Sequence, residues 1–508
     1  MSTKKTRVRF APSPTGPLHI GGVRTALFNY LFAKKNNGDF ILRIEDTDQA
    51  RFVEGAEEYI INSLEWCGIK FDEGIKEGGE YGPYRQSERK MIYHQYADAL
   101  IVSGNAYYAF DTPEELNDIR KQYETEKKTF AYDSSVRDKL NNSIILSEKE
   151  TYKLINSETP YVIRFKMPVN EELILNDIIR GEIKINTSTL DDKILFKSDG
   201  MPTYHLANIV DDHLMEISHV IRGEEWLPSL PLHVLLYKAF LWEKEMPEFA
   251  HLPLLLKPVG NGKLSKRDGD KLGFPVFPLY WKSPSGEEFR GYREDGYFAD
   301  AFINMLVFLG WNPGGEKEIF SMNELIEAFT FERVGKSGSK FDPEKAKWFN
   351  NQYIQTKDNS ELAKLFIPIL KQKGIDAEIL HVTKIVGLVK ERVSFVNELW
   401  EQSYFFFNAP TEYDQKVIKK KWKENTPEIL TGVKEMLSTI TVFEKDNIEP
   451  EFKAYLEKNE IGFGQVMNAL RLTLVGNNSG PDLFTIISLI GKQETINRIE
   501  TGINLIAY

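Results

Sequence analysis

The first 70 residues of the chain alternate between short apolar segments and segments whose apolar residues recur at helical spacing. An apolar segment at residues 8–11 precedes the helical pattern of 21–35, and a second at 40–44 precedes the pattern of 56–66. Strand, helix, strand and helix within this length require a right-handed crossover and a parallel sheet. The sequence therefore predicts an α/β domain whose ligands lie at the carboxyl ends of the strands.

The rest of the 508-residue chain divides into a less regular middle and a helical C-terminal part. Predicted strands bracket a polar segment in the middle, which we interpret as an inserted domain. These strands cover residues 161–167, 193–197 and 217–222. From about Asn312 onward the patterns are helical, so the C-terminal 200 residues or so are predicted to be all-α. The helical patterns include residues 361–373, 378–400 and 463–475.

Composition excludes several classes of protein. With 42% hydrophobic and 27% charged residues the chain is globular, and no apolar stretch reaches the ~18 residues that span a bilayer. No secretory signal is recognisable, so we expect a cytoplasmic protein with no membrane partner. Cys67 is the only cysteine and the eight histidines are scattered, so we expect no structural metal. The net charge of −11 neither indicates nor excludes nucleic acid, because a local basic patch can bind it.

A proline-rich turn at residues 12–22 presents His19 ahead of Gly21 and Gly22, where a helix begins. Glycine has no Cβ, so a base or phosphate can approach the backbone, and the N-terminus of a helix attracts phosphate oxygens. A turn with a purely structural histidine explains the same residues, and for a single motif of this kind it is the commoner explanation.

A second basic element lies in the glycine-flanked loop at residues 260–269. Lys263, Lys266 and Arg267 place three cations within five residues, which suits a mobile clamp that closes on a polyphosphate. A solvated turn accounts for such a charge run as well. The pairing of this loop with the His19 turn favours the phosphate clamp.

Together the two elements resemble the HIGH and KMSKS signatures of class I aminoacyl-tRNA synthetases, here at residues 19–22 and 263–267. Further segments are similar to the bacterial glutamyl-tRNA synthetase family, namely residues 8–16, 43–48, 82–87 and 203–208. The resemblance implies a Rossmann-type α/β catalytic domain with an inserted α+β acceptor-binding domain, followed by an all-α anticodon-binding region. The fourth HIGH position is Gly22 instead of histidine, so more of the phosphate contact is expected from His19 and backbone amides.

This resemblance divides the chain into five segments. Residues 1–105 and 195–260 are the two halves of the catalytic domain, and residues 106–194 are the acceptor-stem-binding insert. Residues 261–345 hold the KMSKS loop and a stem-contact region, and residues 346–508 form the anticodon-binding domain. Helices in this last segment favour a glutamyl enzyme over glutaminyl enzymes, which carry β-barrels there, and over shortened paralogues that modify an anticodon base.

The resemblance implies a reaction in two steps. ATP and L-glutamate form glutamyl-adenylate and pyrophosphate, and the glutamyl group then passes to the 3′-terminal adenosine of tRNA(Glu). The enzyme has only to align the glutamate carboxylate with the α-phosphorus and offset the charge on the phosphates. The implied catalytic residues are His19, Gly21, Lys263 and Lys266. Mg²⁺ would arrive with ATP, held mainly by phosphates and water, and no structural zinc is expected because cysteines are missing near residues 107–111.

Two sets of binding residues follow from the same resemblance. The ATP-binding set is Pro12, His19, Gly21, Gly22, Glu225, Trp226, Ser265 and Lys266. The glutamate-binding set is Arg9, Ala11, Ser13, Glu45, Tyr204, Asn208 and Arg222. Arg9 and Arg222 can fork onto the side-chain carboxylate, while Glu45 takes the ammonium. Glutamine would leave an arginine unpaired, at a cost on the order of several kcal/mol. Taken without the resemblance, ordinary ion pairs between strand ends explain these residues equally well.

Arg392 and Arg471 correspond to anticodon-reading arginines, which can stack on a base and bond to its edge. The lysine-rich run at 416–423 either contacts tRNA phosphates or, as we favour, is a solvated helix face.

Three roles are open for an aromatic insertion at 270–294. It restrains the KMSKS loop, contacts tRNA or, as we favour, forms a small hydrophobic flap. A monomer is the family expectation. Two other functions stay open: a non-catalytic tRNA-binding paralogue, and a non-discriminating enzyme that also charges tRNA(Gln).

Overall fold

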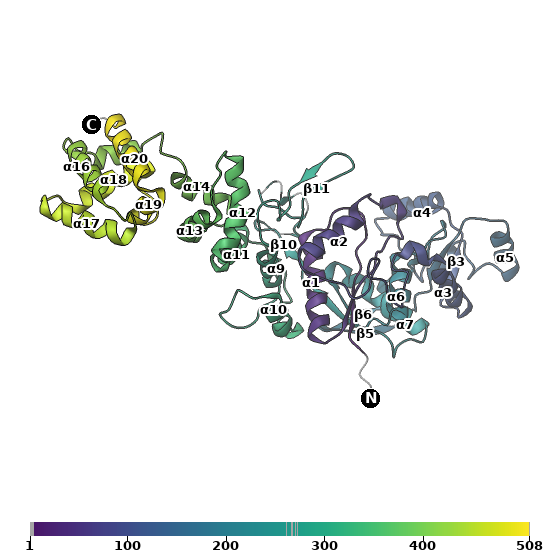
Figure 1. Cartoon of the computed structure of the whole chain (residues 1–508). Helices are drawn as coiled ribbons and strands as arrows, with labels where there is room; N and C mark the ends of the chain where they lie inside the picture. The colour runs from purple at the N-terminus through teal and green to yellow at the C-terminus, as the bar shows by residue number, and fades with distance from the viewer. Residues whose placement is uncertain (1–4, 261, 266–267, 270, 272, 507–508) are drawn as a thin grey trace. The chain divides into compact units, whose positions relative to one another are not determined.

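The computed structural model describes residues 5–260, 262–265, 268–269, 271 and 273–506. The chain forms two compact units, Met1–Ala346 and Lys347–Tyr508. In Figure 1 the first unit runs from purple to green and the second from green to yellow. Each unit has its own core and is described by itself.

The first unit begins with the parallel pair that the sequence predicts. Strand β1 (Arg7–Phe10) pairs in parallel with β2 (Asp39–Leu42), and helix α1 (Ile20–Lys35) connects them. The predicted parallel pair with its connecting helix is therefore confirmed. The helix predicted over residues 56–66 is α2 (Ala56–Trp66).

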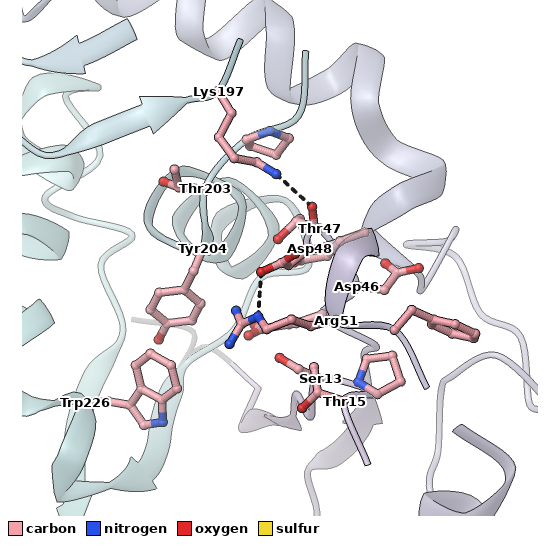
Figure 2. Close-up of a pocket in the computed structure, with 15 residues that line it drawn as sticks. Ser13, Thr15, Asp46, Thr47, Asp48, Arg51, Lys197, Thr203, Tyr204 and Trp226 are labelled. Atoms are coloured by element: carbon pink, nitrogen blue, oxygen red, sulfur yellow. Dashed lines mark hydrogen bonds and ion pairs between the residues drawn. The ribbon is translucent and has the colours of Figure 1, made fainter. Parts of the chain in front are cut away.

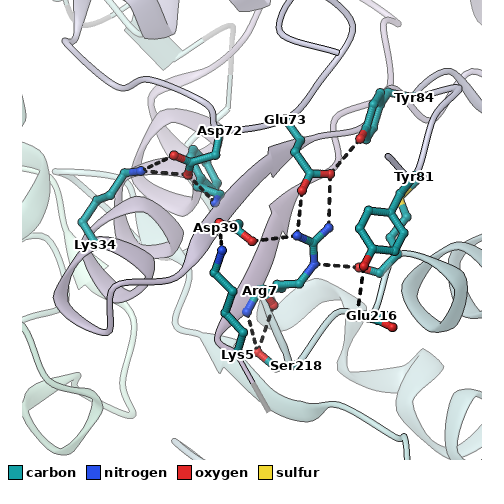
Figure 3. A network of polar contacts seen from close by, with 12 residues as sticks. Lys5, Arg7, Lys34, Asp39, Asp72, Glu73, Tyr81, Tyr84, Glu216 and Ser218 are labelled. Carbon is teal, nitrogen blue, oxygen red and sulfur yellow. Dashed lines mark hydrogen bonds and ion pairs between the residues drawn. The ribbon is translucent and has the colours of Figure 1, made fainter. Parts of the chain in front are cut away.

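A buried arginine links the first residues of β1 and β2. Arg7 on β1 forms ion pairs of 2.7 Å with Asp39 on β2 and with Glu73, and the Tyr84 hydroxyl donates to Glu73 at 2.7 Å (Figure 3). The Arg7 side chain is almost fully buried, so both carboxylates compensate a charge that water does not reach.

A four-stranded mixed sheet completes the core of the catalytic part, in the order β6-β5-β9-β8. Its strands are β5 (Glu172–Asp177), β6 (Gly181–Asn186), β8 (His219–Gly223) and β9 (Glu248–Leu252). β8 and β9 are parallel, β5 and β6 form an antiparallel pair, and β5 meets β9 in parallel at Asp177 and Phe249. The Ser218 amide donates to the Arg7 carbonyl at 2.9 Å, which places β8 beside β1. β5 and β6 fall within the predicted insert, yet they belong to this sheet.

A separate antiparallel sheet lies in the segment between the two catalytic halves. It has the order β3-β4-β7 and consists of β3 (Ala106–Ala109), β4 (Val162–Phe165) and β7 (Ile194–Phe196). Helices α4 (Pro113–Thr125) and α5 (Glu148–Asn156) accompany it, each opened by a capping box. The strands predicted at 161–167 and 193–197 are therefore β4 and β7, whereas the strand predicted at 217–222 is β8 of the other sheet.

Further helices in the described part of the first unit pack on its sheets or on α1. They are α3 (Lys90–Val102), α6 (Tyr204–Leu214), α7 (Leu230–Ala239), α9 (Ala299–Phe308) and α10 (Met322–Ala328). Buried leucines of α6 and α7, such as Leu206 and Leu236, pack in the core beneath the sheet. A short strand, β13 (Ser339–Lys340), pairs in parallel with β10 (Leu255–Leu256). The all-α prediction from Asn312 onward is therefore wrong at this strand, whose two residues are too few to show periodicity.

The aromatic insertion folds onto the catalytic part as a flap, so far as its residues are described. It contains the antiparallel pair β11 (Trp281–Lys282) and β12 (Glu288–Phe289), and the Trp281 ring contacts Tyr59 of α2 edge-on. The Tyr59 hydroxyl exchanges hydrogen bonds with the backbone of Leu279. Burial of Phe277 and Tyr292 agrees with a hydrophobic flap.

The second unit is helical throughout its described residues. Its helices, with the one that leads into it, are α11 (Pro343–Thr356), α12 (Asn359–Gln372), α13 (Ile379–Val389), α14 (Leu399–Ser403), α15 (Gln415–Lys421), α16 (Thr426–Thr439), α17 (Lys445–Lys458), α18 (Phe463–Val475), α19 (Leu483–Ile490) and α20 (Lys492–Leu505). The single helix predicted over 378–400 is wrong. It breaks after Arg392, because Val393 and Phe395 are extended and the Glu398 side chain accepts the Ser394 and Phe395 amides.

Candidate active site

The residues that follow the carboxyl ends of β1, β2 and β8 line one cavity. All seven residues of the predicted glutamate-binding set contribute to it: Arg9, Ala11, Ser13, Glu45, Tyr204, Asn208 and Arg222. Pro12 and Trp226, which were expected near ATP, lie in this cavity too. The chain segments that supply these residues are far apart in sequence, so the fold alone brings them together.

A second cavity adjoins the first at the start of α1. Its walls include Gly21, Gly22 and Glu225, which both cavities share, and also His19, Lys263 and Ser265 from the predicted ATP-binding set. The turn with His19 and the loop with Lys263 therefore face one space, as their pairing predicts. Lys266 lies outside the described residues.

Arg222 is, with Arg9, one of the two buried arginines among the described residues that line the first cavity. Its Nε donates to His251 Nε2 at 3.0 Å and its Nη1 to the Tyr204 hydroxyl at 2.7 Å. Weaker contacts of 3.4 Å reach His233 Nδ1 and the Trp226 carbonyl. Within the described residues no carboxylate forms an ion pair with Arg222, although the residue is 5% exposed. A buried charge that meets only neutral acceptors is suited to an anionic ligand.

Arg9 differs from Arg222 because a carboxylate already holds it. Its Nε and Nη2 donate to the two Asp212 oxygens at 3.0 and 3.2 Å. A ligand carboxylate would therefore meet Arg9 through Nη1, and the two-pronged contact expected of Arg9 is made within the protein. Arg9 and Arg43 together hold the pKa of Asp212 low in spite of its burial.

Glu45 presents the anionic wall of the first cavity. Asn208 Nδ2 donates to Glu45 Oε1 at 2.9 Å, and Arg43 Nη2 lies 3.3 Å from the same oxygen. Arg43 also pairs with Asp212 at 2.8 Å and is fully buried. Burial raises the pKa of Glu45, and the nearby guanidinium groups oppose that rise. Sequence reasoning missed Arg43 and Asp212, although the acidic pair at 211–212 within the apolar pattern of α6 is a visible signal.

His19 caps the N-terminus of α1 and accepts neighbouring amides. Its Nδ1 accepts from the Gly21 amide at 3.1 Å, and its carbonyl accepts from the Gly22 amide at 2.8 Å. The Ile20 amide donates to the Val276 carbonyl of the flap at 3.0 Å. These three amides have acceptors within the protein, so phosphate binding by the amides near Gly21 stays a prediction that requires these hydrogen bonds to be exchanged or shared. The helix dipole is a further backbone contribution.

Two further cations border the second cavity. Lys263 Nζ lies 2.7 Å from Glu225 Oε1, and this contact lowers the pKa of Glu225 despite partial burial. Arg24, one turn into α1, donates to the carbonyls of Leu309 and Pro253. Burial lowers the pKa of Arg24 to about 10. Arg24 is absent from the predicted set, although its spacing from Gly21 places both on one face of the helix.

A third cavity borders the first through Ser13, Glu45, Tyr204 and Trp226. Figure 2 shows Tyr204 and Trp226 on one side of it, facing the loop that carries Asp46 to Arg51. Arg51 Nε lies 2.6 Å from Asp48, and Lys197 Nζ donates to the Thr47 carbonyl at 3.3 Å. This cavity offers a second approach to the same space.

In the second unit, the two predicted anticodon arginines converge on one glycine. Arg392 Nη2 donates to the Gly480 carbonyl at 3.1 Å. A Cβ at Gly480 would lie 3.2 Å from Arg471 Nη1, and its φ of +129° also favours glycine. Burial and the charge of Arg392 lower the pKa of Arg471.

Among the described residues, no three His, Cys, Asp or Glu side chains are grouped so that they could hold a metal ion. No described helix combines the length and apolarity needed to cross a bilayer.

Comparisons with known families agree with the fold. Residues 5–348 match the model for the catalytic domain of class I tRNA synthetases for E and Q, and residues 361–503 match an anticodon-binding domain. The chain is therefore a class I tRNA synthetase with a catalytic and an anticodon-binding part.

Individual relatives indicate to which family within this class the chain belongs. A glutamate–tRNA ligase of Flavobacterium johnsoniae is 61% identical and one of Flavobacterium psychrophilum 62% identical, each aligned over 99% of both chains. The crystal structure of a glutamate tRNA ligase from Elizabethkingia meningosepticum, in complex with its amino acid, superposes with a TM-score of 0.96 at 53% identity, covering 99% of this chain and 100% of that one. The chain belongs to the glutamate–tRNA ligase family.

Proposed function

We propose that this ligase joins L-glutamate to tRNA(Glu) at the expense of ATP, through the two cavities at the carboxyl ends of β1, β2 and β8. The observation that carries the proposal is Arg222, a buried guanidinium without a carboxylate partner among the described residues, in a cavity that adjoins the His19 and Lys263 cavity. A doubly charged amino acid supplies the missing anion.

In this proposal the first cavity binds glutamate by its three charges. Arg222 and the remaining Nη1 of Arg9 bind the side-chain carboxylate, and Glu45 binds the ammonium. Ala11, Ser13, Tyr204 and Asn208 complete the walls. The α-carboxylate then points toward the cavity boundary at Gly21 and Glu225, where it can attack the α-phosphorus of ATP.

The second cavity holds the triphosphate between His19 at one wall and Lys263 at the other. Lys263 must exchange Glu225 for phosphate when ATP binds, because its ammonium is paired with Glu225 in this structure. Lys266 joins it from the loop, as the resemblance implies. Arg24 lines this cavity and adds a fixed positive charge, which stabilises the charge that builds on the leaving pyrophosphate.

Transfer of the glutamyl group requires a ribose hydroxyl of the tRNA beside the carbonyl group of glutamyl-adenylate. The third cavity reaches the glutamate cavity through Ser13, Glu45 and Tyr204, so the 3′-terminal ribose of the tRNA would enter there. In the second unit, Arg392 and Arg471 would read anticodon bases at Gly480.

Mg²⁺ fits this site as a companion of ATP, because Glu225 is a carboxylate that lines both cavities and would lie beside the phosphates. When bound to the phosphates it would neutralise part of their charge. We also propose that the protein acts in the cytoplasm as a monomer.

The test is aminoacylation with purified tRNAs. The enzyme, ATP and Mg²⁺ are combined with labelled glutamate or glutamine, separately on tRNA(Glu) and tRNA(Gln). The proposal expects glutamate on tRNA(Glu) and no charging with glutamine. Glutamate on both tRNAs would establish the non-discriminating alternative, and no charging with full tRNA binding would establish the non-catalytic paralogue.

A further inference from the structure

The guanidinium of Arg222 contacts two histidines, His251 and His233, that have no role in the proposed reaction. Its acceptors are two imidazoles, a phenol and a backbone carbonyl, contributed by β9, α7, α6 and the segment after β8. His251 and His233 are both 0% exposed. Neither residue lines the glutamate cavity. Both histidines therefore contact Arg222 without lining the cavity proposed to bind glutamate.

The protonation of His251 follows from its two partners. Arginine has only donors, so the Nε2 atom that faces Arg222 Nε at 3.0 Å must be an acceptor. The proton of His251 is then on Nδ1, which lies 2.6 Å from Asp177 Oδ2. Asp177 in turn accepts the backbone amides of Ile179 and Arg180 at 3.0 and 2.8 Å. The imidazole is thus held neutral, in one tautomer and one orientation.

The same reasoning applies to His233. Its Nδ1 faces Arg222 Nη1 at 3.4 Å and must accept, so its proton is on Nε2, 3.3 Å from His205 Nδ1. Burial and the charge of Arg222 lower the pKa of His233, and burial lowers the pKa of His205 to about 4. Both imidazoles are therefore neutral around neutral pH, in agreement with the geometry.

We infer that His251, held by Asp177, and His233, backed by His205, are positioning residues that orient the Arg222 guanidinium and leave its charge uncompensated, so that the enzyme prefers glutamate over glutamine. This inference rests on the proposed function, in which Arg222 binds the side-chain carboxylate. The physical reason is the contrast with Arg9, whose charge Asp212 already balances. An arginine oriented by carboxylates would attract a second carboxylate less than one oriented by neutral acceptors.

The acceptor role of His251 is tested with a matched pair of variants. His251→Leu removes the acceptor of Arg222 Nε, whereas His251→Gln keeps an oxygen near the position of Nε2. We expect His251→Leu to raise the KM for glutamate at least about tenfold with the KM for ATP nearly unchanged, because a hydrogen bond to a charged group is lost. His251→Gln should recover most of that loss. Equal effects on both KM values, or no effect of His251→Leu, would overturn the inference.

The charge role is tested with a second pair at His233. His233→Gln keeps a neutral acceptor beside Arg222, and His233→Glu places a carboxylate of the same size there. We expect His233→Glu to lower the preference for glutamate over glutamine at least about tenfold relative to His233→Gln, since the guanidinium then has a partner. An unchanged preference in His233→Glu would overturn the inference.

All four variants are assayed by aminoacylation of tRNA(Glu) beside the unaltered enzyme, and their folding is checked by thermal denaturation. The two proposals fail differently. If the unaltered enzyme does not charge tRNA(Glu) with glutamate, the proposed function is wrong. If it does and the variants match it in the KM for glutamate and in the discrimination of glutamine, only the positioning role is wrong.

Discussion

Two buried arginines of this chain should respond in opposite ways to the same substitution. Arg7 and Arg222 are 6% and 5% exposed, and both belong to the catalytic part. Arg7 pairs with Asp39 and Glu73 at 2.7 Å, whereas Arg222 contacts only neutral acceptors among the described residues. Replacing each by methionine keeps much of the side-chain volume and removes the charge.

For Arg7→Met we expect a loss of stability. Two largely buried carboxylates lose their main partner, which costs about 3–5 kcal/mol when a pair is broken on one side. Lys5 still contacts Asp39 and Tyr84 still donates to Glu73, so the net loss in free energy of unfolding should be about 2–4 kcal/mol. Glutamate specificity should be unchanged, because Arg7 does not line the glutamate cavity.

For Arg222→Met we expect the reverse. The folded protein loses hydrogen bonds of Arg222 but also an uncompensated buried charge, so its free energy of unfolding should change by no more than about 1 kcal/mol. Glutamate loses the ion pair with a buried guanidinium, which costs about 3–5 kcal/mol and corresponds to a fall in kcat/KM of roughly 10²- to 4 × 10³-fold.

Thermal denaturation and aminoacylation of tRNA(Glu), applied to both variants, measure these two effects. If Arg222→Met lowers the melting temperature as much as Arg7→Met does, the charge of Arg222 is compensated in the folded protein and the reasoning is refuted. If Arg222→Met keeps the wild-type KM for glutamate, Arg222 does not bind the side-chain carboxylate.

Four further predictions concern other parts of the chain. Lys266→Ala should slow glutamyl-adenylate formation at least about 100-fold while tRNA affinity, measured by filter binding, stays within about threefold. Arg392→Ala should lower kcat/KM for tRNA(Glu) about 10-fold or more without changing the KM for glutamate, as steady-state charging will show. Burial lowers the pKa of His205 to about 4 in the folded protein, so the unfolded chain binds a proton at a higher pH than the folded chain does. The free energy of unfolding should therefore fall as the pH drops from about 6.5 to 4. Denaturant titrations of His205→Asn should show that the slope of the free energy of unfolding against pH is smaller by about 1.4 kcal/mol per pH unit. A chelator of Mg²⁺ should abolish charging and leave the melting temperature unchanged, whereas a fall in melting temperature would reveal a structural metal.

Local patterns predicted the elements that carry the site. The helix over 56–66 and the parallel pair around α1 needed only periodicity and turn residues, because burying one apolar face gives each element its spacing. Periodicity failed where a side chain replaced the helical hydrogen bonds. At 378–400 the apolar spacing continues, but the Glu398 carboxylate accepts amides at the break, and this contact cannot be inferred from spacing.

Contacts between distant segments were beyond sequence reasoning. Asp212 holds Arg9 and Arg43 from a position more than 150 residues away in the chain, and Asp177 orients His251 across two strands of one sheet. Neither acid belongs to a motif, so only their distances in the fold identify their partners. The engagement of the Gly21 amide by His19 is local, yet it depends on the rotamer of His19, which sequence does not specify.

The amino-acid sequence by itself determined which chemical groups this protein has and the elements that carry them: a histidine turn, a basic loop, and arginines at strand ends. Tertiary structure alone decided the electrostatic state of each group. Arg7, Arg9 and Arg222 are the same residue type in similar burial. Carboxylates balance the first two, whereas the part of the chain that the structure describes offers Arg222 no carboxylate partner. The reason is that charge compensation depends on the distance between groups, and folding sets that distance.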